Sequence, residues 1–132
     1  MSILISIKTK YADMILSGEK TIEIRNKPIV RKGSNVHAYI YSSGIAKKVV
    51  GDCRLHSYGL MTVDDDEFIN ACVTETDFYK YTKGKESAYC YYISSVHPYR
   101  EPLDLSYFGF KRAPQSWSYT HFVPMSVLMG VA

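Results

Sequence analysis

The strongest constraint on the fold is a succession of short segments with the residue content and alternation of β-strands, separated by turn-forming residues. Isoleucine, valine and tyrosine are frequent in them, and these residues favour the pleated, half-buried surface of a sheet. The predicted strands are residues 3–8, 20–26, 36–41, 49–58, 87–96 and 118–123. Five or six short strands are expected to curl into a closed or half-closed barrel, because closure removes exposed sheet edges.

One helix is predicted early, between the first two strands. Thr9 is placed to cap it, Ala12 and Ile15 fall on one apolar face, and Gly18 suits the left-handed residue that ends a helix. Two further helices are predicted over residues 62–72 and from position 74 or 76 to 84, since threonine and acidic residues favour helix starts. The predicted fold class is α+β, a small β-barrel of about five or six strands, with residues 1–132 in a single domain.

Glycine and proline predict local irregularities in this pattern. Gly51 lies inside the fourth predicted strand, where a glycine often marks a bulge or a tight bend. Pro98, Pro102 and Pro114 predict a loop-rich stretch after the fifth strand.

Charge and tyrosine content point to a polyanionic partner. Residues 1–54 carry ten Lys or Arg and four acids, a net charge of +6, whereas residues 55–132 carry six and nine, a net charge of −3. Such a basic half can attract a polyanion, and accidental asymmetry of a solvated surface is the alternative. The chain also has twelve tyrosines, most of which we expect in the sheet and a few in a site that stacks on bases.

The cysteines and the N-terminus bear on location. Cys53, Cys72 and Cys90 are odd in number and widely spaced, which argues against a disulfide framework and for a reducing compartment. The first residues lack the pattern of a signal peptide, and no apolar run is long enough to cross a bilayer. We therefore expect a cytoplasmic protein with no membrane partner.

Several kinds of chemistry lack their sequence signature. The chain has no glycine-rich nucleotide loop, no nucleophile elbow and no pair of Cys or His residues at zinc spacing. Cys53 and His56 come closest, but their odd separation puts them on opposite faces of a strand. His37 and His97 are isolated in the sequence. We expect no metal ion and no cofactor.

The densest group of polar residues lies at positions 18–25, which read GEKTIEIR. On a strand, Glu23 and Arg25 project to the same side, and Lys20 can reach over the same site. A carboxylate there can accept hydrogen bonds from a base, and an arginine can grip a phosphate or a base with two parallel bonds. The alternative interpretation is a surface strand with an ordinary ion pair, which contributes little to stability.

A second candidate site is the segment of residues 114–119, PQSWSY, which contains Gln115, Ser116 and Trp117. It places amide and hydroxyl groups beside two aromatic rings, a mixture that typically holds a single-stranded base. The alternative is that Trp117 fills one end of the barrel as a core residue.

Taken in order, these motifs resemble the ASCH domain, which has a PUA-like fold. The first half of the match is Lys8, the G-x-K-x-x-E-x-R strand at 18–25, Tyr41, Ser42 and Ser43, and the V-V-G of residues 49–51. The second half is the F-Y-x-Y run at 78–81 with Gly84, then Ala88 and Tyr89, then Pro102, Leu103 and Leu105, and the P-Q-S-W of residues 114–117. The match covers nearly the whole chain and keeps the order of the family.

The resemblance implies a PUA-like barrel with a cleft beside the early helix that binds RNA, single-stranded nucleic acid or a modified nucleobase, in a regulatory role. The residues expected to bind are Lys8, Lys20, Glu23, Arg25, Tyr41, Ser42, Ser43, Gln115, Ser116 and Trp117.

Some members of the family resemble enzymes, which leaves a second hypothesis. In one branch, an amidohydrolase that acts on acetylated cytidine, a nucleophilic Thr follows the Lys by three residues. Here Glu23 occupies that place, and a carboxylate cannot replace an activated hydroxyl. Another branch cleaves RNA without a metal, and for that reaction Lys20 and Glu23 would be the acid and base. A third hypothesis is a protein-interaction module that uses the acidic run at residues 64–67.

Overall fold

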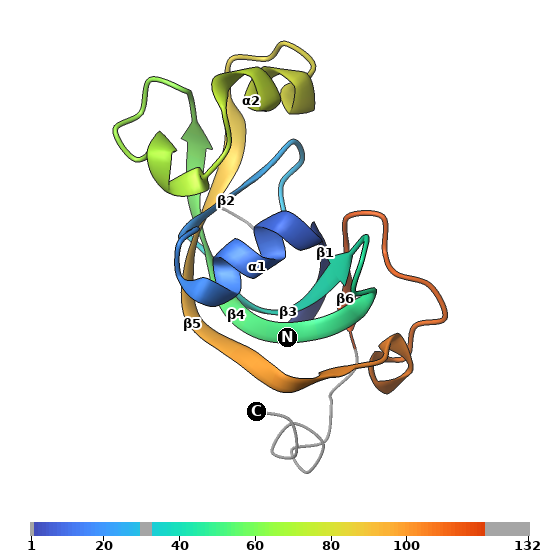
Figure 1. The fold of residues 1–132 in the computed structure, drawn as a ribbon. Coiled ribbons are helices and arrows are strands. Elements are labelled where there is room, and N and C mark those ends of the chain that lie inside the picture. Colours follow the sequence, from blue (N-terminus) through green and yellow to red (C-terminus); the bar gives the residue numbers. More distant parts are fainter. Residues whose placement is uncertain (1, 30–32, 121–132) are drawn as a thin grey trace.

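The structure, a computed structural model, describes residues 2–29 and 33–120. Within these residues, six strands form one curled sheet in the order β2-β5-β4-β3-β1-β6. The sheet is a half-barrel with helix α1 on its concave side (Figure 1). This arrangement confirms the predicted α+β class and the small PUA-like barrel.

The strands and the two α-helices follow one another in the predicted order, and the departures from the prediction lie in β5 and in the connection between β4 and α2. In chain order they are β1 (Ser2–Lys8), α1 (Thr9–Ser17), β2 (Ile22–Arg25), β3 (Asn35–Ser43), β4 (Lys48–Met61), the 3₁₀ helix η1 (Phe68–Ala71), α2 (Glu75–Thr82), β5 (Ala88–Leu103), the 3₁₀ helix η2 (Leu105–Phe108) and β6 (Trp117–Thr120). Strands β1 and β3 pair in parallel, and the other neighbours pair antiparallel.

Helix α1 closes the concave face of the sheet. Its residues Ala12 and Ile15 are fully buried in the core cluster that contains the inward side chains of β1, β3 and β4. Gly18 ends the helix in the left-handed conformation, with φ of 86°, as predicted. The prediction for Thr9 was wrong, because Thr9 is the first residue of the helix and makes no cap. Its hydroxyl instead bonds Ser42 Oγ and the carbonyl of Ser43, which ties the helix start to the end of β3.

The fifth strand is longer than its prolines predicted. Strand β5 continues through Pro98 and Pro102 to Leu103. The pairing of β4 with β5 shifts register on both sides of Gly51, which stands opposite Pro98. Such irregular ladders accept proline, because a missing N–H then leaves no regular bond unmade. The predicted bulge at Gly51 is therefore confirmed, and the predicted loop over Pro98 and Pro102 was wrong.

The connection between β4 and α2 also departs from the prediction. Residues 62–67 form turns and a short 3₁₀ helix follows, where an α-helix over residues 62–72 was predicted. The Thr62 hydroxyl accepts the Asp64 N–H, and the Asp65 carboxylate accepts the Thr62 N–H, which satisfies these groups locally without a helix. The following helix α2 is capped by Thr74, whose side chain accepts the Asp77 N–H, as predicted. Positions 121–123 of the last predicted strand lie outside the described residues.

No helix in the described part of the chain has the length and apolar content needed to cross a membrane.

Gly51 of β4 lies close to both strand β5 and helix α1. A Cβ atom at this position would lie 2.6 Å from the carbonyl oxygen of His97 and 2.7 Å from Leu16 Cδ2. We predict that Gly51→Ala lowers the free energy of unfolding by about 1–3 kcal/mol, because the strand or the helix must move to admit the methyl group. Urea denaturation measures this loss. The control Ser94→Ala, at an exposed position of β5, should change stability little. Equal stability of the two variants would contradict the observed packing.

Candidate functional site

The candidate site is built around strand β2, whose alternation separates apolar from charged side chains. Ile22 and Ile24 are buried in a core cluster with Phe78 of α2. Glu23 and Arg25 lie on the opposite face, as predicted for residues two positions apart on a strand. Both are largely shielded, with side-chain exposures of 7% for Glu23 and 11% for Arg25. The pair is therefore not the surface ion pair that was the alternative interpretation.

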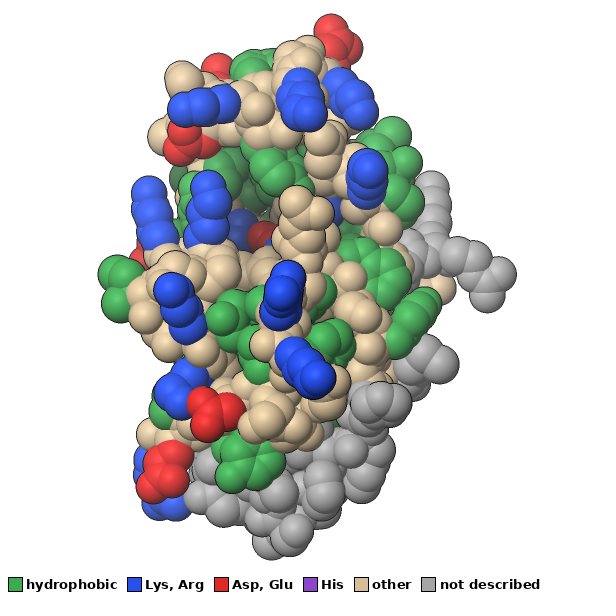
Figure 2. Space-filling model, turned by 90° about the vertical axis from the view of Figure 1, so that its right-hand side faces the viewer, with side chains coloured by type: hydrophobic (Ala, Val, Ile, Leu, Met, Phe, Trp, Pro, Cys, Tyr) green, Lys and Arg blue, Asp and Glu red, His purple; other side chains and the backbone are tan. Residues whose placement is uncertain are grey.

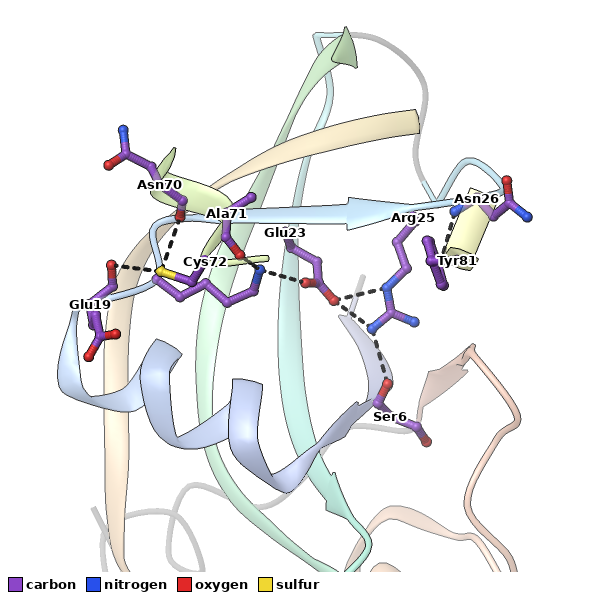
Figure 3. A network of polar contacts seen from close by, with 10 residues as sticks. Ser6, Glu19, Glu23, Arg25, Asn26, Asn70, Ala71, Cys72 and Tyr81 are labelled. Carbon is purple, nitrogen blue, oxygen red and sulfur yellow. Dashed lines mark hydrogen bonds and ion pairs between the residues drawn. The ribbon is translucent and has the colours of Figure 1, made fainter. Parts of the chain in front are cut away.

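Lys20 completes this charged group from the turn before β2. Its side chain is 1% exposed, and its Nζ lies 3.5 Å from Glu23 Oε1. The same ammonium donates to the carbonyl of Ala71 in η1 (Figure 3). It also lies 5.3 Å from the centre of the Tyr11 ring. The Glu23 carboxylate and the Ala71 carbonyl can accept two of the three N–H groups of this ammonium, and no described residue accepts a hydrogen bond from the third.

Arg25 holds the other side of the Glu23 carboxylate. Its Nε and Nη2 donate to Glu23 Oε2 over 3.0 and 2.7 Å. Nη2 also donates to the carbonyl of Ser6 in β1, and Nη1 donates to Ser116 Oγ just before β6. The guanidinium thus links β2 to β1 (Figure 3) and to the segment before β6, and no described residue accepts the fifth of its N–H groups. Its paired N–H edge, which was predicted to grip a phosphate or a base, is engaged with Glu23.

These contacts determine the charge states of the group. Burial raises the pKa of Glu23, but the charges of Arg25 and Lys20 and the hydrogen bonds from both outweigh burial, so the pKa lies below its ordinary value. Burial lowers the pKa of Lys20, and Glu23 opposes this change only in part. The site therefore contains an ionised carboxylate held between two cationic groups, one of which gives up its proton more easily than an exposed lysine does.

A cavity of about 590 Å³ opens above these three residues. The face that contains it is hollowed, with charged atoms at the bottom of the hollow and Lys and Arg side chains around it (Figure 2). The walls come from β1, α1, β2, α2 and the segment before β6. The lining residues that the later arguments use are Tyr11, Lys20, Glu23, Arg25, Lys80 and Tyr81.

Six of the ten predicted binding residues line this cavity: Lys8, Lys20, Glu23, Arg25, Ser43 and Gln115. Ser116 joins them indirectly, since its hydroxyl accepts the bond from Arg25. The segment that carries Gln115 is fixed against β1, because Ser6 donates through its hydroxyl to Pro114 and through its N–H to the carbonyl of Ser116.

Three predicted residues lie elsewhere. Tyr41 is buried in the core cluster on the other face of the sheet. Ser42 is buried and bonded to Thr9, where it supports the turn after β3. Trp117 packs against the main core cluster and meets the Tyr119 ring edge-on, which agrees with the core interpretation.

Helix α2 supplies site residues that the sequence did not point to. Asp77, Lys80 and Tyr81 line the cavity from one face of this helix, together with the buried Phe78. Their spacing of one, three and four residues is that of a single helical face, and this was the available signal. What the sequence lacked was the direction of that face, which depends on how the connection from β4 folds. Tyr11 of α1 also lines the cavity and was not among the predicted site residues.

The fold is shared with solved structures. The crystal structure of ASCH from Zymomonas mobilis superimposes with a TM-score of 0.78 and 21% sequence identity, over 99% of this chain and 96% of that chain. Two of its single-substitution variants give TM-scores of 0.78 and 0.77 at 19% and 20% identity, over 99% of this chain and 99% and 96% of those chains. The chain has the ASCH fold. No family model matches its sequence, and no curated protein does.

A second titratable cluster lies on the ASCH fold away from the cavity. His37 Nε2 and His97 Nδ1 lie 3.1 and 3.2 Å from Asp52 Oδ1, and the Tyr99 hydroxyl donates to Asp52 Oδ2. The two histidines, which are isolated in the sequence, therefore share one carboxylate. Burial raises the pKa of Asp52, but the hydrogen bonds from these partners lower it by more. The pKa therefore lies below its ordinary value, and the carboxyl stays ionised. No group of residues that could hold a metal ion occurs in the described part of the chain.

The buried carboxylate of Glu23 predicts that acid lowers the stability of this ASCH fold. Because the pKa of Glu23 is lower in the folded protein than its ordinary value, the ionised carboxylate stabilises the fold above about pH 4.5, and this contribution is lost as the pH falls below it. We predict that Glu23→Gln lowers the free energy of unfolding at pH 7 by about 3 kcal/mol, since it leaves two buried cations uncompensated. The variant should also lose less stability than the wild type between pH 5 and pH 3.

Denaturant titrations at several pH values measure both effects. Glu86→Gln removes an exposed carboxylate and should keep the stability and the pH dependence of the wild type. If Glu23→Gln behaved like this control, the carboxylate would not have the buried, ion-paired environment described above.

Proposed function

We propose that the chain binds RNA, single-stranded nucleic acid or a modified nucleobase, with one base in the cavity over Lys20, Glu23 and Arg25. The observation that carries the proposal is a base-sized cavity with buried, charge-paired polar groups at its floor and aromatic residues in its walls. Such a combination is typical of sites that hold an unpaired base, since the edge of the base needs hydrogen bonds and its faces need apolar contact.

The groups at the floor of the cavity can both donate and accept hydrogen bonds. Lys20 and Arg25 each have one N–H donor that no described residue accepts. Among the described residues, Glu23 Oε1 pairs with the Lys20 ammonium alone, at 3.5 Å, and it can accept from an amino group. A neutral heterocycle with adjacent donors and acceptors matches this set.

The walls favour a planar ligand. Tyr11 on α1 and Tyr81 on α2 both line the cavity, and Tyr81 is 44% exposed. Its hydroxyl accepts the N–H of Asn26, which fixes the ring at the mouth of the cavity. Base stacking on an aromatic ring of this kind contributes about 1–3 kcal/mol per base.

Two tyrosines on α2 provide a matched test of the proposal. Tyr81 lines the cavity, whereas Tyr79 is similarly exposed, at 38%, and does not line it. We predict that Tyr81→Ala weakens binding of single-stranded RNA about 5- to 100-fold, through the lost stacking, and that Tyr79→Ala changes it little. Fluorescence anisotropy with labelled nonamers of U, C and A measures both affinities. Equal losses in the two variants, with both still folded by circular dichroism, would place binding outside the cavity.

An enzyme that acts on RNA or on a modified nucleoside is the second candidate. The observation that favours it is the pairing of Lys20 with Glu23 inside the cavity, where burial lowers the pKa of the lysine. A lysine of this kind can act as a general acid or base nearer to neutral pH than an exposed one, and such residues gather at catalytic sites.

The second candidate function, an enzyme, requires that the protein convert a substrate into a product. Incubation with total RNA and with a panel of acylated nucleosides, followed by mass spectrometry of the products, tests for it. A product that is lost in both Lys20→Met and Glu23→Gln, but not in the exposed control Glu86→Gln, would establish an enzyme. No product at high protein concentration, with binding intact, would leave the binding function alone.

We also propose a cytoplasmic location. The support for it is that the three cysteines are free thiols, two of them buried, as in proteins of reducing compartments.

A further inference from the structure

The charges around the cavity fall into two groups that differ in their partners. At the floor, Lys20 and Arg25 are paired with Glu23 and are largely buried. At the mouth, Lys8 and Lys80 line the cavity and are exposed. Neither of these two lysines makes an ion pair with any residue of the described chain. The mouth therefore carries two positive charges without a compensating acid in contact.

The two mouth lysines come from different walls. Lys8 is the last residue of β1, immediately before α1, and Lys80 lies on α2. Helices α1 and α2 lie on either side of β2 (Figure 1). Lys and Arg side chains also appear on both sides of the hollow in the space-filling view (Figure 2). A ligand that enters between these walls thus has a cation on each side.

We propose that the cavity takes a nucleotide from within a strand, with its base on the floor and the phosphates on its two sides held by Lys8 and Lys80. This inference rests on the proposed function and specifies the ligand class. A free base or nucleoside would use the floor and leave both lysines unpartnered. A nucleotide within a strand has one phosphate on its 5′ side and one on its 3′ side, which matches two cations on opposite walls.

The same geometry requires an unpaired nucleotide. The hydrogen-bonding groups of Lys20, Glu23 and Arg25 lie at the floor of the cavity, which the edge of a base within a duplex does not reach. The base must also leave the stack of its neighbours to reach between α1 and α2, and this costs least in a single strand, a loop or a bulge. The ligand class is therefore single-stranded nucleic acid, or an extruded nucleotide of a folded RNA.

Three ligands that differ only in their phosphates test the inference. We would titrate the protein with the nucleosides uridine, cytidine and adenosine, with their 5′-monophosphates and with their 3′,5′-bisphosphates, using calorimetry at two salt concentrations. For the base that binds, each added phosphate should tighten binding about tenfold, as charge-assisted bonds to lysine do. The gain should shrink as salt is raised, because each contact involves an exposed charge.

Variants of Lys8 and Lys80 show which wall of the cavity contributes each gain in affinity. Lys8→Gln and Lys80→Gln should each remove about one tenfold step from bisphosphate binding and leave nucleoside binding unchanged. Lys85→Gln, which removes an exposed lysine that does not line the cavity, should change neither. Single-stranded nonamers should show the same pattern, with a salt dependence that decreases by roughly 0.7 in slope for each lysine removed.

The possible failures are distinguishable. If the nucleoside, the monophosphate and the bisphosphate bind equally, or if only the 5′-phosphate adds affinity, the inference of a nucleotide within a strand is overturned and the proposed function stands. If neither the nucleosides nor the nonamers bind at all, the proposed function fails and the inference fails with it. Lys85→Gln and Lys80→Gln could also lose the same affinity for the bisphosphate. The phosphates would then be attracted by the overall positive charge and not held by Lys8 and Lys80, which would also overturn the inference.

Discussion

The structure depends most on the ionised carboxylate of Glu23, which is held out of water. A carboxylate in this position must be compensated, and Arg25 and Lys20 do so from its two sides. These two cations also donate hydrogen bonds to Ala71 in η1, to Ser6 in β1 and to Ser116 in the segment before β6. The short strand β2 lies at one edge of the sheet, so these polar bonds join it to elements that the sheet ladder does not reach. They hold the walls of the cavity in place.

This arrangement separates a floor from a mouth in electrostatic terms. At the floor, the two cations Lys20 and Arg25 contact the one carboxylate of Glu23, and these groups can bond the edge of a neutral base. At the mouth, Lys8 and Lys80 form no ion pair with a described residue, and such exposed charges attract phosphates over longer distances. A nucleotide has the same division, with a neutral heterocycle at one end and a charged phosphate at the other. The proposed ligand follows from this correspondence, and the ASCH fold by itself does not determine it.

The strands and the first helix were predictable because their signals are local. The alternation of residues 20–26 placed Glu23 and Arg25 on one face, and Gly18 and Gly51 marked a helix end and a bulge. The course of β5 through Pro98 and Pro102 was not predictable, since it depends on an irregular register with β4. The burial of Lys20 was also hidden, because its partner Ala71 lies 51 positions away in a 3₁₀ helix that was predicted as an α-helix. The wall residue Tyr81 was missed, since which face of α2 meets the cavity depends on the same connection.

The central claim is that the cavity over Lys20, Glu23 and Arg25 is where a base binds, and a crystal structure of the complex tests it most directly. Crystals grown with a single-stranded RNA nonamer should show one base within the cavity, its edge within hydrogen-bonding distance of Glu23 Oε1 and of Lys20 Nζ or Arg25 Nη1, and its ring against Tyr81. An RNA bound on another face of the molecule, with this cavity unoccupied by any base, would contradict the account.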